Sequence, residues 1–505
     1  MGLRLFNTMG RSMEDFAPIT PGYVGFYGCG PTVYNYAHIG NLRAYVFLDT
    51  LDRTLTFLGY DKKHVMNITD IGHLTGDADE GEDKMLKTAR ERHESVLEVA
   101  QFYTDAFFKD IDSLNIIRPD VVCKATEHIP EMIDLIKRIE ANGHTYMAGG
   151  NLYYDVSTYP DYGKLAGLNL DDLKAGARID IDKNKRSPYD FVLWFTKSKF
   201  ENQALTWDSP WGRGYPGWHI ECSAMSMKYL GEHFDIHTGG IDHVPIHHTN
   251  EIAQSEGATG RKWVNYWLHN EFLVVSKDKD DKEGGAKMSK SAGNFLRLQT
   301  LIDKGYHPLD YRYFLLGTHY RKQIYFSWEA MDGAKSARKS LVQKVARIVQ
   351  AAGGITALNA LPAFAKGETS DGSALSAGAK EILSAFRDAL ENDLSTPVAV
   401  SQIQKVVKES ALAPAEALSL VARMDSVLAL GLLDGAKLVL SAPAAEVSSG
   451  HDGDPEAAEI DALVKERVEA KKSKNFARAD EIRDELSKRG ILVTDTPQGP
   501  VWSRR

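Results

Sequence analysis

The 505-residue sequence has few cysteines and no long apolar run. Its three cysteines, Cys29, Cys123 and Cys222, are too few and odd in number for a disulfide framework, which favours a reducing compartment and predicts a cytoplasmic protein. Because no run of about 18 apolar residues occurs, we expect no membrane-spanning helix. The first residues lack the apolar centre of a secretory signal peptide, so we expect no such signal.

The sequence also lacks an excess of positive charge. Its net charge of −9 argues against an indiscriminate nucleic-acid binder, and its 43% hydrophobic and 26% charged residues are typical of a globular protein. The charge is uneven, because residues 461–505 carry a net charge of +3 and the remainder carries −12. The basic tail permits local contact with a polyanion, although charge alone favours a solvated helical surface.

The length predicts about three domains. Residues 352–380 and 441–458 are rich in small and polar residues and read as linkers. In the first part, residues 23–29 and 64–69 are typical of strands and residues 41–58 of a helix. Strand, glycine turn, helix and strand indicate a βαβ unit of an open parallel sheet.

The middle and the end of the chain have different patterns. Apolar stripes at helical spacing predict a helical bundle after residue 330, including a helix that starts at Ser395 with a proline in its first turn. The tail predicts two helices, at about 460–473 and 476–489, and a strand-like piece over 491–502.

Seven of the 16 histidines lie between residues 219 and 269. Within this cluster, His247 and Glu251 are spaced i and i+4, so that one helical face presents both side chains. Together with Cys29 and Cys222 they form a borderline-soft set of ligands that suits Zn²⁺. The spacing is not a standard zinc motif, so two buried cysteines and an ordinary helical pair remain the alternative.

Two further segments have the chemistry of a nucleotide site. Residues 37–41 (Ala-His-Ile-Gly-Asn) lie at a strand-to-helix turn, where a helix N-terminus attracts phosphate. Residues 287–291 (Lys-Met-Ser-Lys-Ser) follow a glycine-bearing charged stretch, and two lysines on a loop can stabilise charge on a leaving pyrophosphate. Taken alone, each segment is a weak signal.

In this order, the two segments resemble the two nucleotide signatures of class I aminoacyl-tRNA synthetases. The surrounding sequence is similar to that of the cysteinyl-tRNA synthetases along nearly the whole chain. The segments that carry this resemblance are residues 27–34, 67–70, 207–211, 217–225, 250–254, 318–321, 395–397 and 476–502.

The resemblance implies an α/β fold with a Rossmann-like parallel-sheet catalytic domain split by an insertion, followed by an α-helical bundle and a small α+β C-terminal domain. The implied boundaries are 1–115 and 206–330 for the catalytic domain with its stem-contact region, 116–205 for the insertion, 331–440 for the tRNA-binding bundle, 441–458 for a linker and 459–505 for the anticodon-binding domain.

The resemblance also implies the amino-acid site. One Zn²⁺ per chain would be held by Cys29, Cys222, His247 and Glu251. A metal–thiolate bond would distinguish cysteine from serine, which a pocket of shape and hydrogen bonds does poorly. The rest of the pocket would be formed by Gly30, Thr69, Trp218 and His237.

The implied ATP site combines the two signatures. His38, Gly40 and Asn41 would bind the phosphates, while Lys287 and Lys290 would stabilise the transition state. The adenosine would contact Gly239, Gly240 and Asp242, and Mg²⁺ would accompany ATP. The expected catalytic set is therefore His38, Asn41, Lys287 and Lys290.

The implied activity is that of an ATP-dependent cysteine–tRNA ligase. L-cysteine would be activated to cysteinyl-adenylate with release of pyrophosphate, and then transferred to the 3′-terminal ribose of tRNA(Cys). Asp480, Asp495 and Trp502 match tail positions of the family and would contact the anticodon. No membrane partner is expected, and a monomer is favoured although the oligomeric state is left open.

The sequence departs from the family pattern at four places, one of which is a long loop before Lys287. Residues 71–84 form a longer acidic loop, and a shifted proline makes His248 an alternative to His247 as a zinc ligand. Lys471 stands where arginine is common, which puts any bidentate base contact there in doubt.

Two other functions compete with this interpretation. The first is an adenylate-forming ligase that joins cysteine to an amino sugar, and the tail after residue 459 argues against it. The second is a non-catalytic, zinc-stabilised RNA-binding paralogue, and the complete set of site residues argues against that function.

Overall fold

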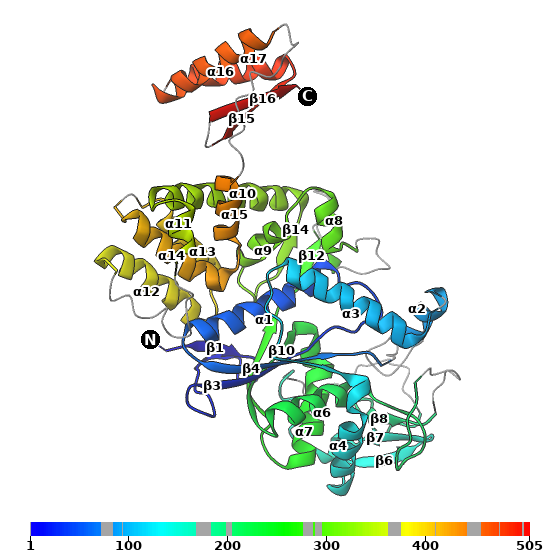
Figure 1. Cartoon of the computed structure of the whole chain (residues 1–505). Coiled ribbons are helices and arrows are strands. Elements are labelled where there is room, and N and C mark those ends of the chain that lie inside the picture. The colour runs from blue at the N-terminus through cyan, green and yellow to red at the C-terminus, as the bar shows by residue number, and fades with distance from the viewer. Residues whose placement is uncertain are drawn as a thin grey trace.

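The computed structural model (Figure 1) is built around a five-stranded parallel sheet. It describes residues 2–71, 84–92, 94–167, 183–197, 205–275, 286–287, 295–361, 375–409, 411–441, 456–473, 475–496 and 499–504. The strands lie in the order β11-β10-β3-β4-β5, and every neighbouring pair is parallel. Their bounds are Val264–Asn270 (β11), Phe234–Gly240 (β10), Tyr23–Gly28 (β3), Asp61–Ile68 (β4) and Val121–Lys124 (β5).

The first βαβ unit is confirmed. Helix α1 (Ile39–Phe57) connects β3 to β4, close to the predicted helix over 41–58. Gly59, with φ of +94°, allows the chain to reverse after the helix. Side chains of β3 alternate between two cores, since Val24 and Phe26 pack in the core on the α1 side and Tyr27 packs in the core of α6 and α7.

The strand order contains a topological switch point at β3. The chain first adds β4 and β5 on one side of β3, and later adds β10 and β11 on the other. Helix α1 lies on one face, whereas α6 (Trp218–Leu230) and α7 (Thr249–Thr259) lie on the other, as Figure 1 shows. In open α/β sheets, ligands bind at the carboxyl ends of the strands beside such a switch point. This rule directs attention to the ends of β3 and β10.

The excursion between β4 and β10 holds several elements. Helices α2 (Lys84–Arg92) and α3 (Val96–Ser113) precede β5, and α4 (Ile129–Ala141) follows it. An antiparallel sheet comes next, formed by β6 (Thr145–Ala148), β7 (Asn151–Tyr154), β8 (Phe191–Phe195) and β9 (Tyr215–Pro216).

Strand pairing crosses both predicted limits of the insertion, residues 116 and 205. Strand β5 lies inside the predicted insertion but pairs with β4 in the parallel sheet. Strand β9 lies beyond residue 205 but pairs with β8 in the antiparallel sheet. These pairings join residues far apart in the sequence, which local sequence patterns do not reveal.

The elements after the parallel sheet lead into the helical bundle. A small sheet has the order β13-β12-β14, with bounds Ala286–Lys287, Leu273–Val275 and Ile324–Phe326. The neighbouring helices are α8 (Leu298–Asp303) and α9 (Pro308–Leu316). The predicted bundle is formed by α10 (Trp328–Ala351), α11 (Ile355–Asn359), α12 (Ala377–Glu391), α13 (Thr396–Val406), α14 (Pro414–Leu428) and α15 (Leu432–Ser441).

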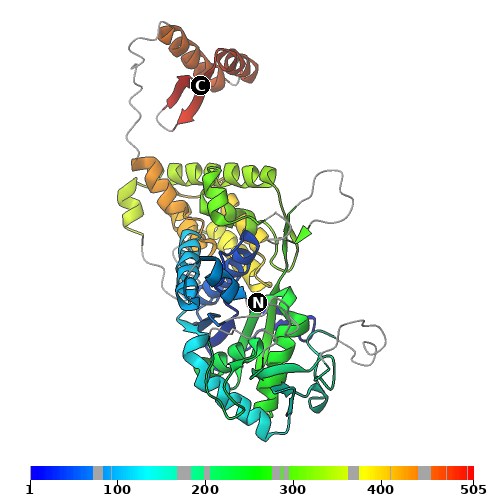
Figure 2. The ribbon, with the colours of Figure 1, turned by 90° about the vertical axis from the view of Figure 1, so that its right-hand side faces the viewer.

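The two ends of the chain form further small elements. Strands β1 (Arg4–Asn7) and β2 (Ser12–Asp15) pair with each other near the N-terminus. The C-terminal unit, orange to red in Figure 2, holds α16 (Ala457–Lys472), α17 (Phe476–Lys488), β15 (Ile491–Thr496) and β16 (Gly499–Arg504). It has its own core, which includes Ile460, Ile482 and Leu486. The predicted α+β tail is therefore confirmed.

Much of the predicted linker 441–458 and the acidic loop lie outside the described residues. Residues 352–380, predicted as a linker, contain the short helix α11 and the start of α12. In the part of the chain that the structure describes, the helices are too short or too polar to cross a membrane.

Candidate metal and nucleotide site

The four predicted metal ligands converge at the switch point of the sheet. Cys29 directly follows β3, Cys222 lies on α6, His247 lies in the π-helical turn Val244–His248, and Glu251 lies in the first turn of α7. One ligand atom from each lies within 4.8 Å of the others. Two thiols, an imidazole and a carboxylate at this separation can close around a single metal ion.

The i, i+4 relationship of His247 and Glu251 survives although the local helix is irregular. The Nε2 atom of His247 lies 2.6 Å from Glu251 Oε1. The other carboxylate oxygen, Oε2, lies 2.6 Å from Nε2 of His237, which comes from β10. Glu251 therefore joins two histidines from different elements in a fully buried position.

A second group of side chains overlaps the first. The ligand atoms of Cys29, His237, His248 and Glu251 also lie within 4.8 Å of one another. The two groups share Cys29 and Glu251, so the sequence-based choice between His247 and His248 reappears as two adjacent arrangements in the same buried cluster.

The pKa values of the two thiols in the cluster are shifted in opposite directions. A hydrogen bond from Cys29 lowers the pKa of Cys222 to about 6, while His247 contributes in the same direction. Burial raises the pKa of Cys29 well above its ordinary value, and its bond to Cys222 adds to this rise. Cys222 is therefore the thiol that ionises first, and the thiolate is the form that binds metal.

The charges on the opposite side of the cluster are coupled. Burial raises the pKa of Glu251, but the charges of His247 and His237 outweigh it and lower the pKa to about 2. Burial lowers the pKa of His247, but Glu251 and Cys222 outweigh it and raise the pKa to about 10. The raised pKa means that His247 holds an extra proton between the Glu251 carboxylate and the Cys222 thiolate. A divalent cation bound by these groups would replace that proton.

A chain of hydrogen bonds, partly or fully buried, includes the neighbours of Cys29 and Cys222. The Gly30 N–H donates to Asn67 Oδ1 (2.8 Å), and the Asn67 side-chain amide donates to the Thr69 hydroxyl (3.0 Å). The Thr69 hydroxyl donates to Glu221 Oε2 (2.9 Å). Gly30 and Thr69 were predicted for the amino-acid pocket, whereas Asn67 and Glu221 were missed, although both lie in segments that resemble the family.

The aromatic residue predicted for the pocket lies next to the cluster. The rings of Trp218 and His247 have centroids 4.6 Å apart. Nδ1 of His247 lies 2.9 Å from Nδ1 of His219, the residue after Trp218. The first turn of α6 thus packs on the cluster of candidate metal ligands.

The predicted phosphate-binding turn is a helix cap. His38 is the N-cap of α1: the Asn41 N–H donates to His38 Nδ1 (3.0 Å), and the His38 N–H donates to Asn41 Oδ1 (3.2 Å). Because Nδ1 accepts a hydrogen bond, the neutral ring carries its proton on Nε2. Gly40 lies in the same turn, where a side chain would meet the His38 ring at 3.0 Å.

The other predicted nucleotide residues lie at the ends of further strands. Gly239 and Gly240 end β10, and Asp242 lies in the following 3-10 helix Ile241–His243. Lys287 lies on β13, where its backbone pairs with Val274. The Lys287 side chain and Lys290 lie outside the described residues.

The predicted anticodon residues have different surroundings. Asp480 is exposed on α17 and forms an ion pair with Arg483 (3.0 Å). The indole N–H of Trp502 donates to Asp461 Oδ1 (2.6 Å), and its ring packs on the tail core. Asp495 lies on β15 opposite Pro500, and its side chain is outside the described part. Trp502 thus has a structural contact that sequence reasoning did not anticipate.

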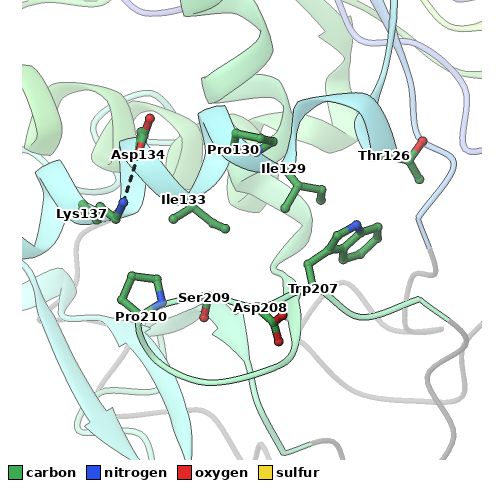
Figure 3. A pocket seen from close by; sticks show the side chains of 10 residues that line it. All are labelled: Thr126, Ile129, Pro130, Ile133, Asp134, Lys137, Trp207, Asp208, Ser209 and Pro210. Atoms are coloured by element: carbon green, nitrogen blue, oxygen red, sulfur yellow. Dashed lines mark hydrogen bonds and ion pairs between the residues drawn. The ribbon is translucent and has the colours of Figure 1, made fainter.

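A separate pocket of about 610 Å³ is shown in Figure 3. It runs between α4, with Ile129 and Ile133, and the segment 207–210, with Trp207. It contains none of the residues predicted for the amino-acid or nucleotide site.

Comparison with known proteins gives the family. Residues 15–336 match the family model "tRNA synthetases class I (C) catalytic domain", and residues 455–502 match "Cysteinyl-tRNA ligase anticodon binding domain". The chain belongs to the cysteine–tRNA ligase family. The family resemblance and the fold class expected from the sequence are thereby confirmed.

Two relatives match this chain along its full length. A protein of Treponema denticola named cysteine–tRNA ligase is 58% identical, with 100% of each chain covered. A protein of the same name from Treponema pallidum (strain Nichols) is 47% identical, also with 100% of each chain covered.

A solved structure supports the fold alone. Methionyl-tRNA synthetase of Mycobacterium tuberculosis, bound by methionyl-adenylate, matches with a TM-score of 0.53 at 15% identity, covering 82% of this chain and 92% of that one.

Proposed function

We propose that this protein is a cysteine–tRNA ligase, which activates L-cysteine with ATP and transfers it to tRNA(Cys). The observation that carries this conclusion is the full-length identity of 58% to a protein of that name, together with the two family models. Enzymatic ligase activity is the function shared by these relatives, and neither the amino-sugar ligase nor the non-catalytic paralogue gains support from them.

Zn²⁺ is the metal we propose for the buried cluster, with Cys29, Cys222, His247 and Glu251 as ligands. Support comes from the separation of their ligand atoms, all within 4.8 Å, and from their borderline-soft chemistry. When bound, zinc would supply a direct bond to the substrate thiolate, which serine does not match. Gly30, Thr69, Trp218 and His237 would enclose the substrate beside this metal.

Adenylation would require positioning and charge stabilisation rather than a protein nucleophile. The cysteine carboxylate attacks the α-phosphorus of ATP, and the bond to pyrophosphate breaks. We assign His38 Nε2–H, Gly40 and Asn41 to the phosphates, and Gly239, Gly240 and Asp242 to the adenosine. Lys287 and Lys290 would stabilise the charge that develops on pyrophosphate, with Mg²⁺ accompanying ATP.

Transfer to tRNA would use the rest of the chain. The hydroxyl of the terminal ribose attacks the carbonyl carbon of the adenylate, and AMP leaves. The helical bundle would contact the body of the tRNA, and the C-terminal unit would read the anticodon with Asp480 and Asp495. Trp502, at the edge of the tail core, would also contact the anticodon. A monomer in the cytoplasm completes the proposal.

Aminoacylation of a defined tRNA tests the proposed function. Purified protein, ATP, labelled cysteine and tRNA with a GCA anticodon are combined, with serine as the control amino acid. Acid-stable label on the tRNA with cysteine alone is the expected result. Cysteine-dependent ATP–pyrophosphate exchange without transfer would point instead to a small-molecule ligase, and absence of exchange would contradict the proposal.

A further inference from the structure

Helix α1 carries a buried arginine five residues after His38. Arg43 is 4% exposed, and its guanidinium lies against a set of main-chain carbonyls. Nη1 donates to the carbonyl of Phe272, and Nη2 donates to those of Lys322 and Tyr320, the last at 3.2 Å. The Arg43 side chain therefore forms hydrogen bonds to two segments of the chain, at Phe272 and at Lys322, which are 50 residues apart in the sequence.

Each of these two segments leads into a strand of the small sheet. Phe272 directly precedes β12, and Lys322 lies two residues before β14. These strands pair in parallel, with Leu273 opposite Ile324. Strand β12 also pairs with β13, where Val274 lies opposite Lys287. Arg43 is thus hydrogen-bonded to the residues that lead into β12 and β14. The third strand of this sheet, β13, ends at Lys287.

The chain after the second signature returns to the same helix. The Ile39 N–H, in the first turn of α1, donates to the carbonyl of Leu296 (2.8 Å). The His38 ring packs edge-on against Phe295, with centroids 5.6 Å apart. The chain therefore leaves α1 at Phe272 and returns to it at Leu296, so both ends of the lysine-bearing segment are fixed to the helix that carries His38.

The chemistry of Arg43 suits a rigid attachment. Burial lowers the pKa of its guanidinium to about 10, which leaves it charged at neutral pH. A charged donor strengthens hydrogen bonds to carbonyls, and the planar fork fixes the directions in which they point. A lysine at this position would keep the charge but could not reproduce a fork that spans Phe272 and Lys322.

We propose that Arg43 is a positioning residue for adenylation, which sets the β12–β13 hairpin, and hence Lys287, in register with the His38 turn. This inference rests on the proposed function, because it assigns Lys287 to the transition state. Arg43 would touch neither ATP nor cysteine. Its effect would fall on the rate of the chemical step, since a displacement of about 1 Å in a reacting group costs about 100-fold in rate.

Arg53 offers a matched control on the same helix. Its guanidinium also donates to main-chain carbonyls, those of Ser426 (2.8 Å) and Asn115 (2.7 Å), and it pairs with Asp49 (2.8 Å). These contacts lie at α14 of the bundle, at the end of α3 and within α1, rather than at the small sheet. Loss of Arg53 therefore removes a similar number of hydrogen bonds from α1 without releasing the hairpin.

Cysteine-dependent ATP–pyrophosphate exchange of the full chain separates the two arginines. Arg43→Lys should lower kcat by about 10- to 100-fold, with zinc content and the KM for cysteine within about twofold of the original protein. Arg53→Lys should keep kcat within about threefold. Equal effects of the two substitutions on kcat, or a loss of zinc that parallels the loss of rate in Arg43→Lys, would overturn the proposal.

Hydrogen exchange gives a readout that does not depend on activity. In Arg43→Lys, peptides covering residues 273–275 and 286–287 should exchange faster than in the original protein, and Arg53→Lys should leave them unchanged. Unaltered protection in Arg43→Lys would overturn the positioning role whatever the kinetics. If the original protein showed no exchange activity, the proposed function would fail, while the hydrogen-exchange result would still decide whether Arg43 fixes the hairpin.

Discussion

The Nε2 atom of His248 lies 3.4 Å from the Sγ atom of Cys29. Nδ1 of the same ring lies 2.7 Å from Nε2 of His269, so the imidazole is held between a proposed metal ligand and a further buried histidine. Burial and the surrounding histidines lower the pKa of His248 well below its ordinary value, which keeps the ring neutral. His248 is therefore suited to support Cys29, whereas His247 lies between Cys222 and Glu251.

Separate replacement of the two histidines should distinguish their roles. His247→Ala removes an imidazole between Cys222 and Glu251, so we expect bound zinc to fall from one per chain to a small fraction. His248→Ala should still bind zinc, but with an affinity about 10- to 100-fold lower. This is the usual cost of losing a group that supports a metal ligand. Metal analysis after dialysis against a graded chelator measures both, and Cys222→Ala should lose zinc and cysteine activation together. Full zinc in His247→Ala with none in His248→Ala would reverse the assignment.

Gly30 is the glycine whose replacement should damage the site most directly. A Cβ atom there would lie 1.7 Å from the backbone carbonyl of Asn67 on β4, which a rotamer change does not relieve. Gly30→Ala should therefore separate the Cys29 turn from β4, destabilise the fold by about 1–3 kcal/mol and reduce zinc binding. Denaturant unfolding and metal analysis measure the two effects.

Gly333→Ala is the control, because a Cβ on α10 meets nothing within 4 Å. Alanine is the better helix former, so this substitution should be neutral or stabilising by up to about 1 kcal/mol. Equal stability and zinc content of Gly30→Ala and the original protein would show that the close approach to Asn67 does not constrain the turn.

The fold was more predictable than the detailed contacts of the site. The helix over 41–58 and the two tail helices follow from apolar spacing and end signals that are local in sequence. Local signals did not assign β5 and β9 to their sheets, because strand pairing depends on which edge is available in three dimensions.

The candidate ligands could be named from the sequence because two cysteines, a histidine and a glutamate lie in segments that resemble the family. Their neighbours were harder to predict. Asn67 connects Gly30 to Thr69, and Glu221 accepts from Thr69, yet neither side chain has a spacing that indicates this contact. Such a chain joins β4 to α6, two elements about 150 residues apart, and only the packed sheet brings them together.

Arg312 on α9 forms a buried ion pair where α1, α9 and α14 meet, and we expect this pair to contribute strongly to the stability of the fold. Its guanidinium pairs with Asp49 and donates to the carbonyls of Leu428 (2.7 Å) and Leu114 (3.0 Å). Arg312→Met leaves Asp49 paired with Arg53 but removes its buried pair with Arg312 and the donors to two carbonyls, so unfolding free energy should fall by about 2–4 kcal/mol. Arg118→Met is the control, since Arg118 and Asp112 form an ion pair that is half exposed, and it should cost less than about 1 kcal/mol. Denaturant midpoints within error of each other would contradict the expected ranking.

Asp110 on α3 should make stability depend on pH. Burial raises the pKa of its carboxyl to about 6, and Arg297 only partly offsets this rise. In the unfolded chain the pKa is about 4, so the folded state holds the proton more tightly. The stabilising contribution of the proton is therefore complete below about pH 4 and is lost as the pH rises through 6.

Asp110→Asn keeps the shape of the side chain but removes the charge, so its advantage over the original protein should grow between pH 5 and pH 8. Because the side chain is only partly buried, we expect a gain of about 1 kcal/mol, or about 2–4 °C in Tm, at the higher pH. Asp105→Asn, at an exposed position of the same helix, is the control for removal of a carboxylate that is not buried. A Tm difference for Asp110→Asn that does not change with pH would mean that the carboxyl is already ionised at pH 5, because only a group that titrates between the two conditions changes the slope of stability with pH.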